Sequence, residues 1–253
     1  MYKYILLVVF FVFFSCNRKL AKVDTAQNFK PDSLNCNYAD FDLANYFNID
    51  QIARFENEIQ RFIKMDSLNK PEDSCIVFVG SSSIRKWITL ESSFSPLPVL
   101  NRGFGGSTFP ELIYYSNELI FKYNPKIVVI YEGDNDQYFL SPYQIFECAC
   151  YLEKNIHEVM PNTIVYFLSA KPSPSRREKI RSTIQTNKYL EALSMYSENT
   201  YYIDVWSPMF DENLNIRGDI FKKDSLHLNE EGYIIWYNVV FPVIEQKYNS
   251  KIP

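Results

Sequence analysis

The stretch Cys75–Ser83 reads CIVFVGSSS and passes from five apolar residues directly into a glycine and three serines. An apolar run that is continuous rather than alternating is typical of a strand buried on both faces of a sheet. Four more short runs of the same kind follow along the chain. They are Pro98–Leu100, Ile127–Tyr131, Thr163–Leu168 and Tyr201–Val205. The chain therefore contains five predicted strands.

Longer stretches of helical character flank and separate these strands. They are Ile49–Lys64, Phe109–Tyr123, Pro142–Val159, Arg176–Tyr196 and Glu230–Tyr248. Strands that alternate with helices form a parallel sheet with helices on both faces. We predict one α/β domain over residues 46–253, a three-layer sandwich around a five-stranded, mostly parallel sheet.

Composition restricts the class of protein. The 253 residues are 47% hydrophobic and 22% charged, with a formal net charge of −4, which is ordinary for a globular protein. The acidic balance argues against a nucleic-acid partner, since such proteins carry a basic face. Of only seven glycines, five closely follow the first three predicted strands. Turns need glycine, but this skew also favours backbone that approaches a ligand at the carboxyl edge of the sheet.

The first sixteen residues differ from the rest of the chain. The apolar run Tyr4–Phe14 is too short to span a membrane and has the length of the apolar region of a secretory signal. A serine and then Cys16 follow, an arrangement that resembles a bacterial lipoprotein signal. We expect residues 1–15 to be a signal peptide and residues 16–45 a lipidated N-terminus and tether. An ordinary signal with an incidental cysteine is the alternative.

This interpretation also predicts where the protein is located. It would be exported as a bacterial membrane-anchored lipoprotein, on the periplasmic side or at the cell surface. The lipid on Cys16 would be its only contact with the membrane.

Four other cysteines remain, Cys36, Cys75, Cys148 and Cys150, and the sequence leaves their disulfide pairing open. Cys75 lies in a predicted strand and is expected to be a small buried hydrophobe. Cys148 and Cys150 with His157 match no standard zinc spacing. We therefore expect them to pack on a helix, with no metal ion bound.

Three predicted strands are followed by short polar or glycine-rich motifs. After the first comes Gly80–Ser83, and a serine between a strand and a helix is by itself most often a helix cap. After the second comes Asn101–Ser107, a glycine-rich loop whose backbone N–H groups suit an anion but which lacks the lysine of a phosphate loop. After the third comes Gly133–Asp136, where the amide of Asn135 could donate to a negative oxygen or simply serve a turn.

The most informative stretch is Asp224–Tyr233, DSLHLNEEGY, just before the last predicted helix. A turn could bring the carboxylate of Asp224 against the ring of His227. The aspartate would fix the tautomer of the imidazole and leave the other ring nitrogen free to take a proton from a hydroxyl. A single D-x-x-H is more often only a surface turn. The other histidine, His157, has no matching acid at a loop position, and we expect a partly exposed structural residue.

Taken together, the four motifs resemble the SGNH or GDSL-like hydrolase family, over nearly the whole span of residues 75–236 and in the family's order. The serine, glycine, asparagine and histidine that name the family are matched by Ser82, Gly106, Asn135 and His227. The first motif reads Gly-Ser-Ser in place of Gly-Asp-Ser, a variant that the family tolerates. The resemblance implies a flavodoxin-like fold and the hydrolysis of esters.

The residues themselves suit this chemistry. A serine hydroxyl needs a base within hydrogen-bond reach, and that base needs a third group to orient it. Ser82, His227 and Asp224 would fill these roles. The backbone N–H groups of Ser82 and Gly106 and the side chain of Asn135 would hold the oxyanion. No metal or organic cofactor is required.

The resemblance leaves the natural ester open. Short loops after the predicted strands, flanked by Phe104, Tyr138 and Phe139, favour a shallow site and a short acyl group. An exported, tethered enzyme would meet glycans. We therefore expect a serine esterase that removes short acyl groups, above all acetyl, from a small molecule or a carbohydrate. The alternatives are a lysophospholipase or short-chain lipid esterase, and a non-catalytic lipoprotein that holds a glycan in the same pocket.

Overall fold

The computed structural model describes residues 41–46 and 54–250, which all lie in the compact unit spanning residues 36–253. The expected signal peptide, Cys16 and Cys36 lie outside the described residues. Of the expected tether, Leu43–Asn45 forms a short 3-10 helix, η2. Within the described part of the chain, no helix combines the length and apolar character needed to cross a membrane.

Five strands form one sheet in the order β2-β1-β3-β4-β5. Their bounds are β1 Ile76–Gly80, β2 Val99–Gly103, β3 Ile127–Tyr131, β4 Ile164–Leu168 and β5 Thr200–Ile203. All four neighbouring pairs are parallel. This is the doubly wound order of flavodoxin-like folds, so the predicted fold is confirmed. Gly80 pairs in register with Gly103 on one side and Tyr131 on the other, which places the carboxyl ends of three strands at one level.

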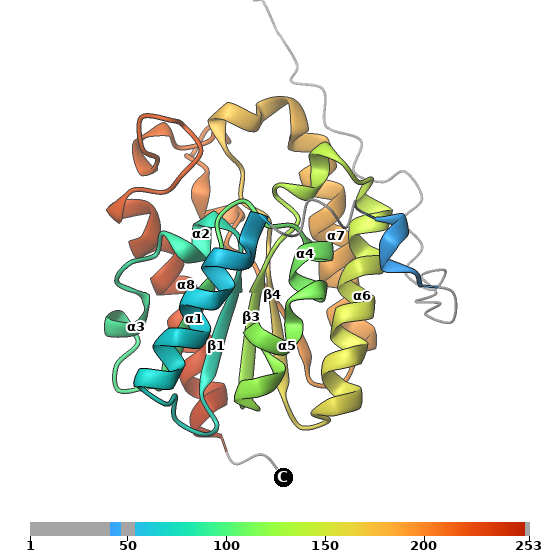
Figure 1. Cartoon of the computed structure of the whole chain (residues 1–253). Coiled ribbons are helices and arrows are strands. Elements are labelled where there is room, and N and C mark those ends of the chain that lie inside the picture. The colour runs from blue at the N-terminus through green and yellow to red at the C-terminus, as the bar shows by residue number, and fades with distance from the viewer. Residues whose placement is uncertain (1–40, 47–53, 251–253) are drawn as a thin grey trace, which may run out of the picture. The chain divides into compact units, whose positions relative to one another are not determined.

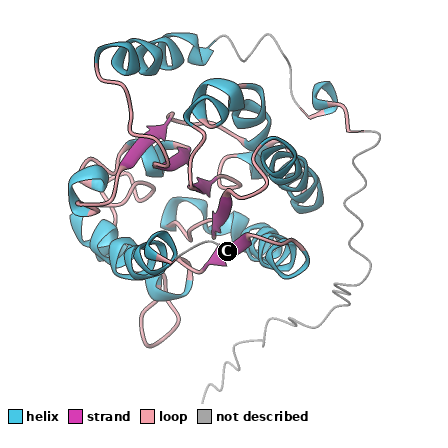
Figure 2. Cartoon of the chain, turned by 90° about the horizontal axis from the view of Figure 1, so that it is seen from below, coloured by secondary structure: helices cyan, strands magenta, loops and turns pink. Residues whose placement is uncertain are grey.

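Helices cover both faces of the sheet (Figures 1 and 2). The α-helices are α1 Glu56–Leu68, α2 Ser82–Arg85, α3 Leu90–Ser93, α4 Phe109–Tyr114, α5 Ser116–Leu119, α6 Pro142–Val159, α7 Ile180–Tyr196 and α8 Glu230–Asn249. On one face, Trp236 of α8 and Trp87, just after α2, pack in one buried cluster with Phe78 of β1. On the other face, the ring of Phe109 at the start of α4 contacts that of Phe167 on β4.

The predicted helix directly before β3 is interrupted in the structure. The expected helix Phe109–Tyr123 consists of α4, α5 and a 3-10 turn, η4 Phe121–Tyr123. Backbone angles leave helical values at Tyr115 (φ −93°, ψ 15°) and at Ile120 (φ −130°, ψ −66°). The bend at Tyr115 turns its buried ring edge-on to that of Phe104, so packing overrides the helical pattern there.

Two other helices begin later than predicted. Helix α1 begins at Glu56 and continues to Leu68, beyond the expected end at Lys64. Helix α7 begins at Ile180, after a 3-10 segment, η6 Pro174–Lys179, in which Arg176 is non-helical (φ −119°, ψ 27°). That departure accompanies a set of side-chain contacts made by Arg176, described below.

Of the described cysteines, Cys75 directly precedes β1, and Cys148 and Cys150 lie on α6 with His157. Cys75 and Cys148 are buried free thiols, and burial raises the pKa of Cys75 to about 11. Cys150, buried beside Cys148 on α6, is disulfide-bonded. The ring of His157 lies between Glu153 Oε1 at 2.9 Å and the backbone oxygen of Thr163 at 3.1 Å, as a structural residue would. Within the described residues, no group of three or more His, Cys, Asp or Glu side chains is placed to hold a metal ion.

Candidate active site

Ser82, His227 and Asp224 form a hydrogen-bonded chain at the carboxyl edge of the sheet. Ser82 is the first residue of α2, directly after β1. Its Oγ lies 3.1 Å from His227 Nε2, and His227 Nδ1 lies 2.6 Å from Asp224 Oδ2. Because an ionised carboxylate can only accept, Nδ1 carries the proton and Nε2 accepts from the serine. This is the tautomer that a general base needs.

A local turn positions the acid and the base. Asp224 Oδ1 accepts from the backbone N–H of Leu226 at 3.0 Å and of His227 at 2.9 Å. The turn places Ser225 in the left-handed region, with φ 54°, and returns the chain to pair Phe221 with Leu228. One carboxylate oxygen therefore shapes the loop while the other orients the imidazole.

The environment sets the ionisation of both groups. The hydrogen bond from His227 holds the pKa of Asp224 far below its usual range, and the backbone N–H of His227 adds to this. Burial lowers the pKa of His227, and the charges of Lys86 and Lys171 lower it further. The hydrogen bond to Asp224 raises this pKa, but the net shift is downward. The imidazole is therefore neutral near pH 7 and available as a base.

Three candidate oxyanion donors come from the segments that follow β1, β2 and β3. Within the described residues, the backbone N–H groups of Ser82 and Gly106 have no hydrogen-bond acceptor. Asn135 donates one amide hydrogen to the backbone oxygen of Ser107 at 2.9 Å. A side-chain amide has two hydrogens, so one is left over. Two backbone donors and one amide donor are the set that a tetrahedral oxyanion requires.

Comparison with known proteins identifies the family of the chain. Residues 80–235 match the GDSL-like Lipase/Acylhydrolase family. The chain belongs to that family. A search of the curated proteins found no match. The matched span begins at Gly80 and ends just after Tyr233, so it contains all four motifs.

Solved structures share its fold. A candidate acylhydrolase from Bacteroides fragilis is 21% identical, with a TM-score of 0.66 over 75% of this chain and 97% of that one. A GDSL-like lipase from Bacteroides thetaiotaomicron is 20% identical, with a TM-score of 0.62 over 74% and 97%. An acetylxylan esterase from Geobacillus stearothermophilus is 14% identical, with a TM-score of 0.56 over 72% and 97%.

The glycine-rich loop is held by Glu58 of α1 and by Arg54 just before this helix, which the sequence did not indicate. Gly106 has φ 89°, a region that glycine enters without strain. Arg54 Nη2 donates to the backbone oxygen of Gly106 at 3.2 Å and to Glu111 at 2.6 Å. Glu58 accepts from Gly105 N at 3.4 Å and pairs with Arg85 at 2.8 Å. Arg54 and Glu58 precede the residues that match the family, so no family motif could have identified them.

Two buried acids, Glu132 and Asp136, stabilise the loops around the site. Ser107 Oγ donates to Glu132 Oε1 at 2.5 Å, and Glu132 is 1% exposed. Burial raises the pKa of Glu132 well above its usual value, and Asp136 raises it further. Asp136 accepts from the backbone N–H of Phe109 at 2.7 Å and of Gly133 at 2.8 Å. It therefore joins the start of α4 to the loop after β3.

A second set of contacts that sequence reasoning missed surrounds Asp134. Lys171 Nζ and Arg176 Nη1 both donate to this buried carboxylate at 2.5 Å. Burial raises the pKa of Asp134, but the two cations outweigh it and the pKa is lowered. Asp134 belongs to the G-x-N-D motif, whereas neither cation lies in a motif.

One expectation about the site's surroundings was wrong. Of the aromatic residues that flank the motifs, Phe104 is fully buried, whereas Tyr138 and Phe139 are 49% and 76% exposed. The segment Asp204–Asn229, between β5 and α8, is a long connection with two 3-10 turns, η7 Ser207–Met209 and η8 Gly218–Ile220. Not every loop at this edge is therefore short, because the segment that carries the acid and the base has to return across the sheet edge.

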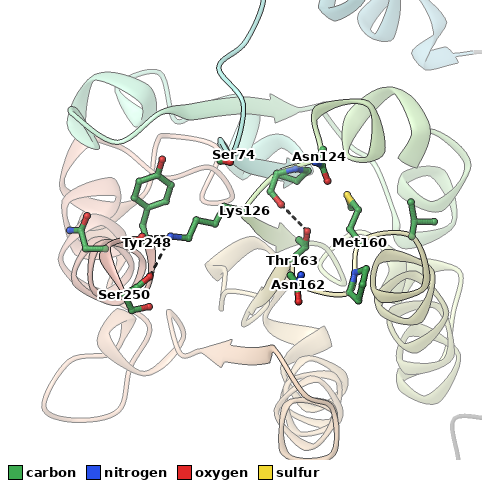
Figure 3. A pocket seen from close by; sticks show the side chains of 12 residues that line it. Ser74, Asn124, Lys126, Met160, Asn162, Thr163, Tyr248 and Ser250 are labelled. Carbon is green, nitrogen blue, oxygen red and sulfur yellow. Dashed lines mark hydrogen bonds between the residues drawn. The ribbon is translucent and has the colours of Figure 1, made fainter. Parts of the chain in front are cut away.

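Two surface cavities differ in their relation to the triad. One of about 1010 Å³ lies between the start of α8 and the region after α2. Its lining includes Lys86, Trp87, Ile234 and Leu228, the residue after His227, but none of the three triad residues. Figure 3 shows another, lined in part by Lys126 and Thr163, at the amino ends of β3 and β4. In this second cavity Lys126 Nζ donates to backbone oxygens at the end of α8. It therefore lies at the edge opposite to the triad.

Proposed function

We propose that this GDSL-like hydrolase is a serine esterase in which Ser82 is the nucleophile. The observation that carries the proposal is the continuous hydrogen-bonded chain from Ser82 through His227 to Asp224. The family supports hydrolysis of acyl groups. The catalytic residues and the ester are the parts that we infer.

The reaction follows from the groups at the site. Ser82 Oγ attacks the ester carbonyl carbon while His227 Nε2 takes the hydroxyl proton. The C=O electron pair moves to the oxygen, which is stabilised by the N–H groups of Ser82 and Gly106 and by Asn135. His227 then gives its proton to the departing alcohol, and the acyl group stays on Ser82. A water molecule, deprotonated by His227, then attacks the acyl carbon. The bond to Ser82 Oγ breaks, His227 returns the proton to that oxygen, and the acid leaves.

Short acyl esters on carbohydrate are the substrates that we propose. One structural neighbour is an acetylxylan esterase, and exposed Tyr138 and Phe139 follow Asn135 closely. Aromatic rings of this kind offer apolar faces to a sugar.

The apolar lining of the cavity beside the triad favours a second candidate, a short-chain lipid esterase. Its lining includes Trp87, Leu228 and the half-exposed Ile234. A cavity of this kind could hold a longer acyl chain.

The test is hydrolysis of p-nitrophenyl acetate, butyrate and octanoate by residues 17–253, beside Ser82→Ala. We expect kcat/KM to be highest for the acetate and the activity to be lost in Ser82→Ala. A maximum at octanoate would favour the lipid esterase. If neither hydrolysis nor labelling by a fluorophosphonate exceeds that of Ser82→Ala, the protein is not a serine hydrolase, and a glycan-binding role becomes the better proposal.

We propose further that the enzyme is exported and anchored through a lipid on Cys16. The apolar run before Cys16 and the disulfide at Cys150 support this location, since disulfides persist in oxidising compartments. Fractionation of cells that express the full chain should place it with membranes, and Cys16→Ser should release it. A wild-type chain recovered in the soluble fraction would contradict the anchor.

A further inference from the structure

Arg176 contacts both residues at the centre of the loop after β3. Its Nη2 donates to Asn135 Oδ1 at 2.8 Å, and its Nη1 donates to the backbone oxygen of Asp134 at 2.8 Å and to Asp134 Oδ1 at 2.5 Å. Arg176 lies in η6, between β4 and α7. One guanidinium thus connects a segment outside the four motifs to the proposed oxyanion donor.

These contacts leave the Asn135 amide one orientation. Its oxygen accepts from Arg176, and its nitrogen donates to the backbone oxygen of Ser107 at 2.9 Å. Rotating the amide by 180° would turn its NH₂ group toward the guanidinium, which has only donors, and its oxygen toward the Ser107 oxygen. Both hydrogen bonds would be lost. The amide nitrogen is therefore held on the side of the glycine-rich loop, with one hydrogen left to donate.

Burial and charge keep Arg176 in this position. Its side chain is 15% exposed, and its guanidinium carbon lies 5.3 Å from the centre of the Tyr138 ring. Asp134 is ionised and is shared with buried Lys171. Separating a buried, hydrogen-bonded ion pair is costly because it leaves a charge without a partner. The guanidinium is thus fixed before any substrate binds.

We propose that Arg176 is a positioning residue for ester hydrolysis, which holds the Asn135 amide so that its free N–H faces the developing oxyanion. A donor that is already oriented stabilises the transition state without reorganising. The hydrogen bond to the amide oxygen also polarises the amide and strengthens its N–H donors. The inference rests on the proposed esterase function and extends it to a residue outside the triad and the three donors.

The experiment compares five proteins with the wild type: Arg176→Ala, Arg176→Lys, Asn135→Ala, the double variant Asn135→Ala/Arg176→Ala, and Arg177→Ala. Arg177 is the matched control, since it is the exposed neighbour and its side chain has no hydrogen bond or ion pair within the described residues. The measurements are kcat and KM on p-nitrophenyl acetate, the rate of Ser82 labelling by a fluorophosphonate, and thermal unfolding.

Loss of an oxyanion donor lowers kcat by about 10²–10³, and we expect this of Asn135→Ala. Arg176→Ala should lower kcat roughly 10- to 100-fold, with KM changed less than about threefold. In the Asn135→Ala background the same change should cost less than about threefold, because the residue acts through that amide. Guanidinium chloride below denaturing concentrations should restore part of the kcat of Arg176→Ala and leave Arg177→Ala unchanged.

Arg176→Lys covers the case in which Arg176→Ala fails to fold. A lysine keeps the charge near Asp134 but cannot span Asp134 and Asn135 with one fork of donors. We expect it to fold and to lose kcat. Wild-type kcat in Arg176→Lys, or an equal loss from Arg176→Ala with and without Asn135, would overturn the inference while Ser82→Ala still shows a serine esterase. Wild-type protein no more reactive than Ser82→Ala would overturn the proposed function and this inference with it.

Discussion

His227 shows how single contacts set the chemistry of one residue. The bond to Asp224 favours the charged imidazolium, whereas burial and nearby cations favour the neutral ring. The second group of effects is the stronger, so the pKa of His227 is lowered. A base with a lowered pKa stays deprotonated to lower pH, and the acid limb of kcat/KM should therefore lie below the usual histidine value of about 6.5.

Removing Lys86 tests this balance. Lys86 lowers the pKa of His227 through its charge, so Lys86→Gln should raise that pKa and move the acid limb of kcat/KM to higher pH. The shift should shrink in 1 M salt, because salt screens charges at a partly exposed site. The control is Lys64→Gln, which removes the same charge at an exposed position of α1. It should leave the pH profile of kcat/KM unchanged. Coinciding profiles for Lys86→Gln and the wild type would show that the charge of Lys86 does not contribute to the pKa of His227.

At the scale of elements, the site depends on how closely α2 approaches β2. A Cβ atom at Gly103, the last residue of β2, would lie 2.2 Å from the backbone nitrogen of Arg85. No side chain can be accommodated there without moving backbone. This close approach fixes the height of α2, and with it Ser82, above the sheet.

Gly103→Ala should therefore displace α2. We expect a loss of about 1–3 kcal/mol in the free energy of unfolding and a fall in kcat of roughly tenfold or more, because the Ser82–His227 hydrogen bond lengthens. Gly218→Ala is the matched control, since a Cβ at Gly218 meets nothing within 4 Å, and its effect should stay within about 0.5 kcal/mol. The measurements are the free energy of unfolding in denaturant and kcat for both variants. If Gly103→Ala and Gly218→Ala show the same values, α2 adjusts to the added methyl group without cost.

At the scale of the whole molecule, buried acids tie the site to global stability. Glu132 is buried between the loop after β2 and the sheet, and burial raises its pKa well above the usual value. A carboxyl group of this kind is protonated in the folded chain but loses its proton on unfolding above about pH 4.3. Its contribution is fully present below that pH and is lost as pH rises toward the folded pKa.

Glu132→Gln removes the loss of stability with rising pH that the titration of Glu132 causes, and it keeps the shape of the side chain. Its free energy of unfolding relative to the wild type should rise by about 1.4 kcal/mol for each pH unit between the two pKa values of Glu132. Urea unfolding at several pH values between 5 and 8 measures the difference, with exposed Glu198→Gln as the control. A difference that does not change with pH would mean that Glu132 is ionised in the folded protein.

The sequence by itself determined the features that local pattern carries. Continuous apolar runs identify strands because burial on both faces leaves no polar alternation, and helix α6 begins and ends where its pattern predicts, at Pro142 and Val159. Asp224 and His227 could be paired because they are three positions apart and a turn brings them together. The order of the four motifs was also sufficient to indicate the family.

Only the tertiary structure decided the contacts between distant segments. Ser82 and His227 are 145 residues apart and meet because β1 and the segment before α8 end at the same edge of the sheet. Arg54 reaches the site from just before α1, and Arg176 reaches it from η6. No periodicity in the sequence distinguishes these two from the other arginines of the chain. The bend at Tyr115 likewise follows from packing on Phe104. Periodicity records which side of an element is buried, whereas the partner of a polar side chain depends on how the elements pack.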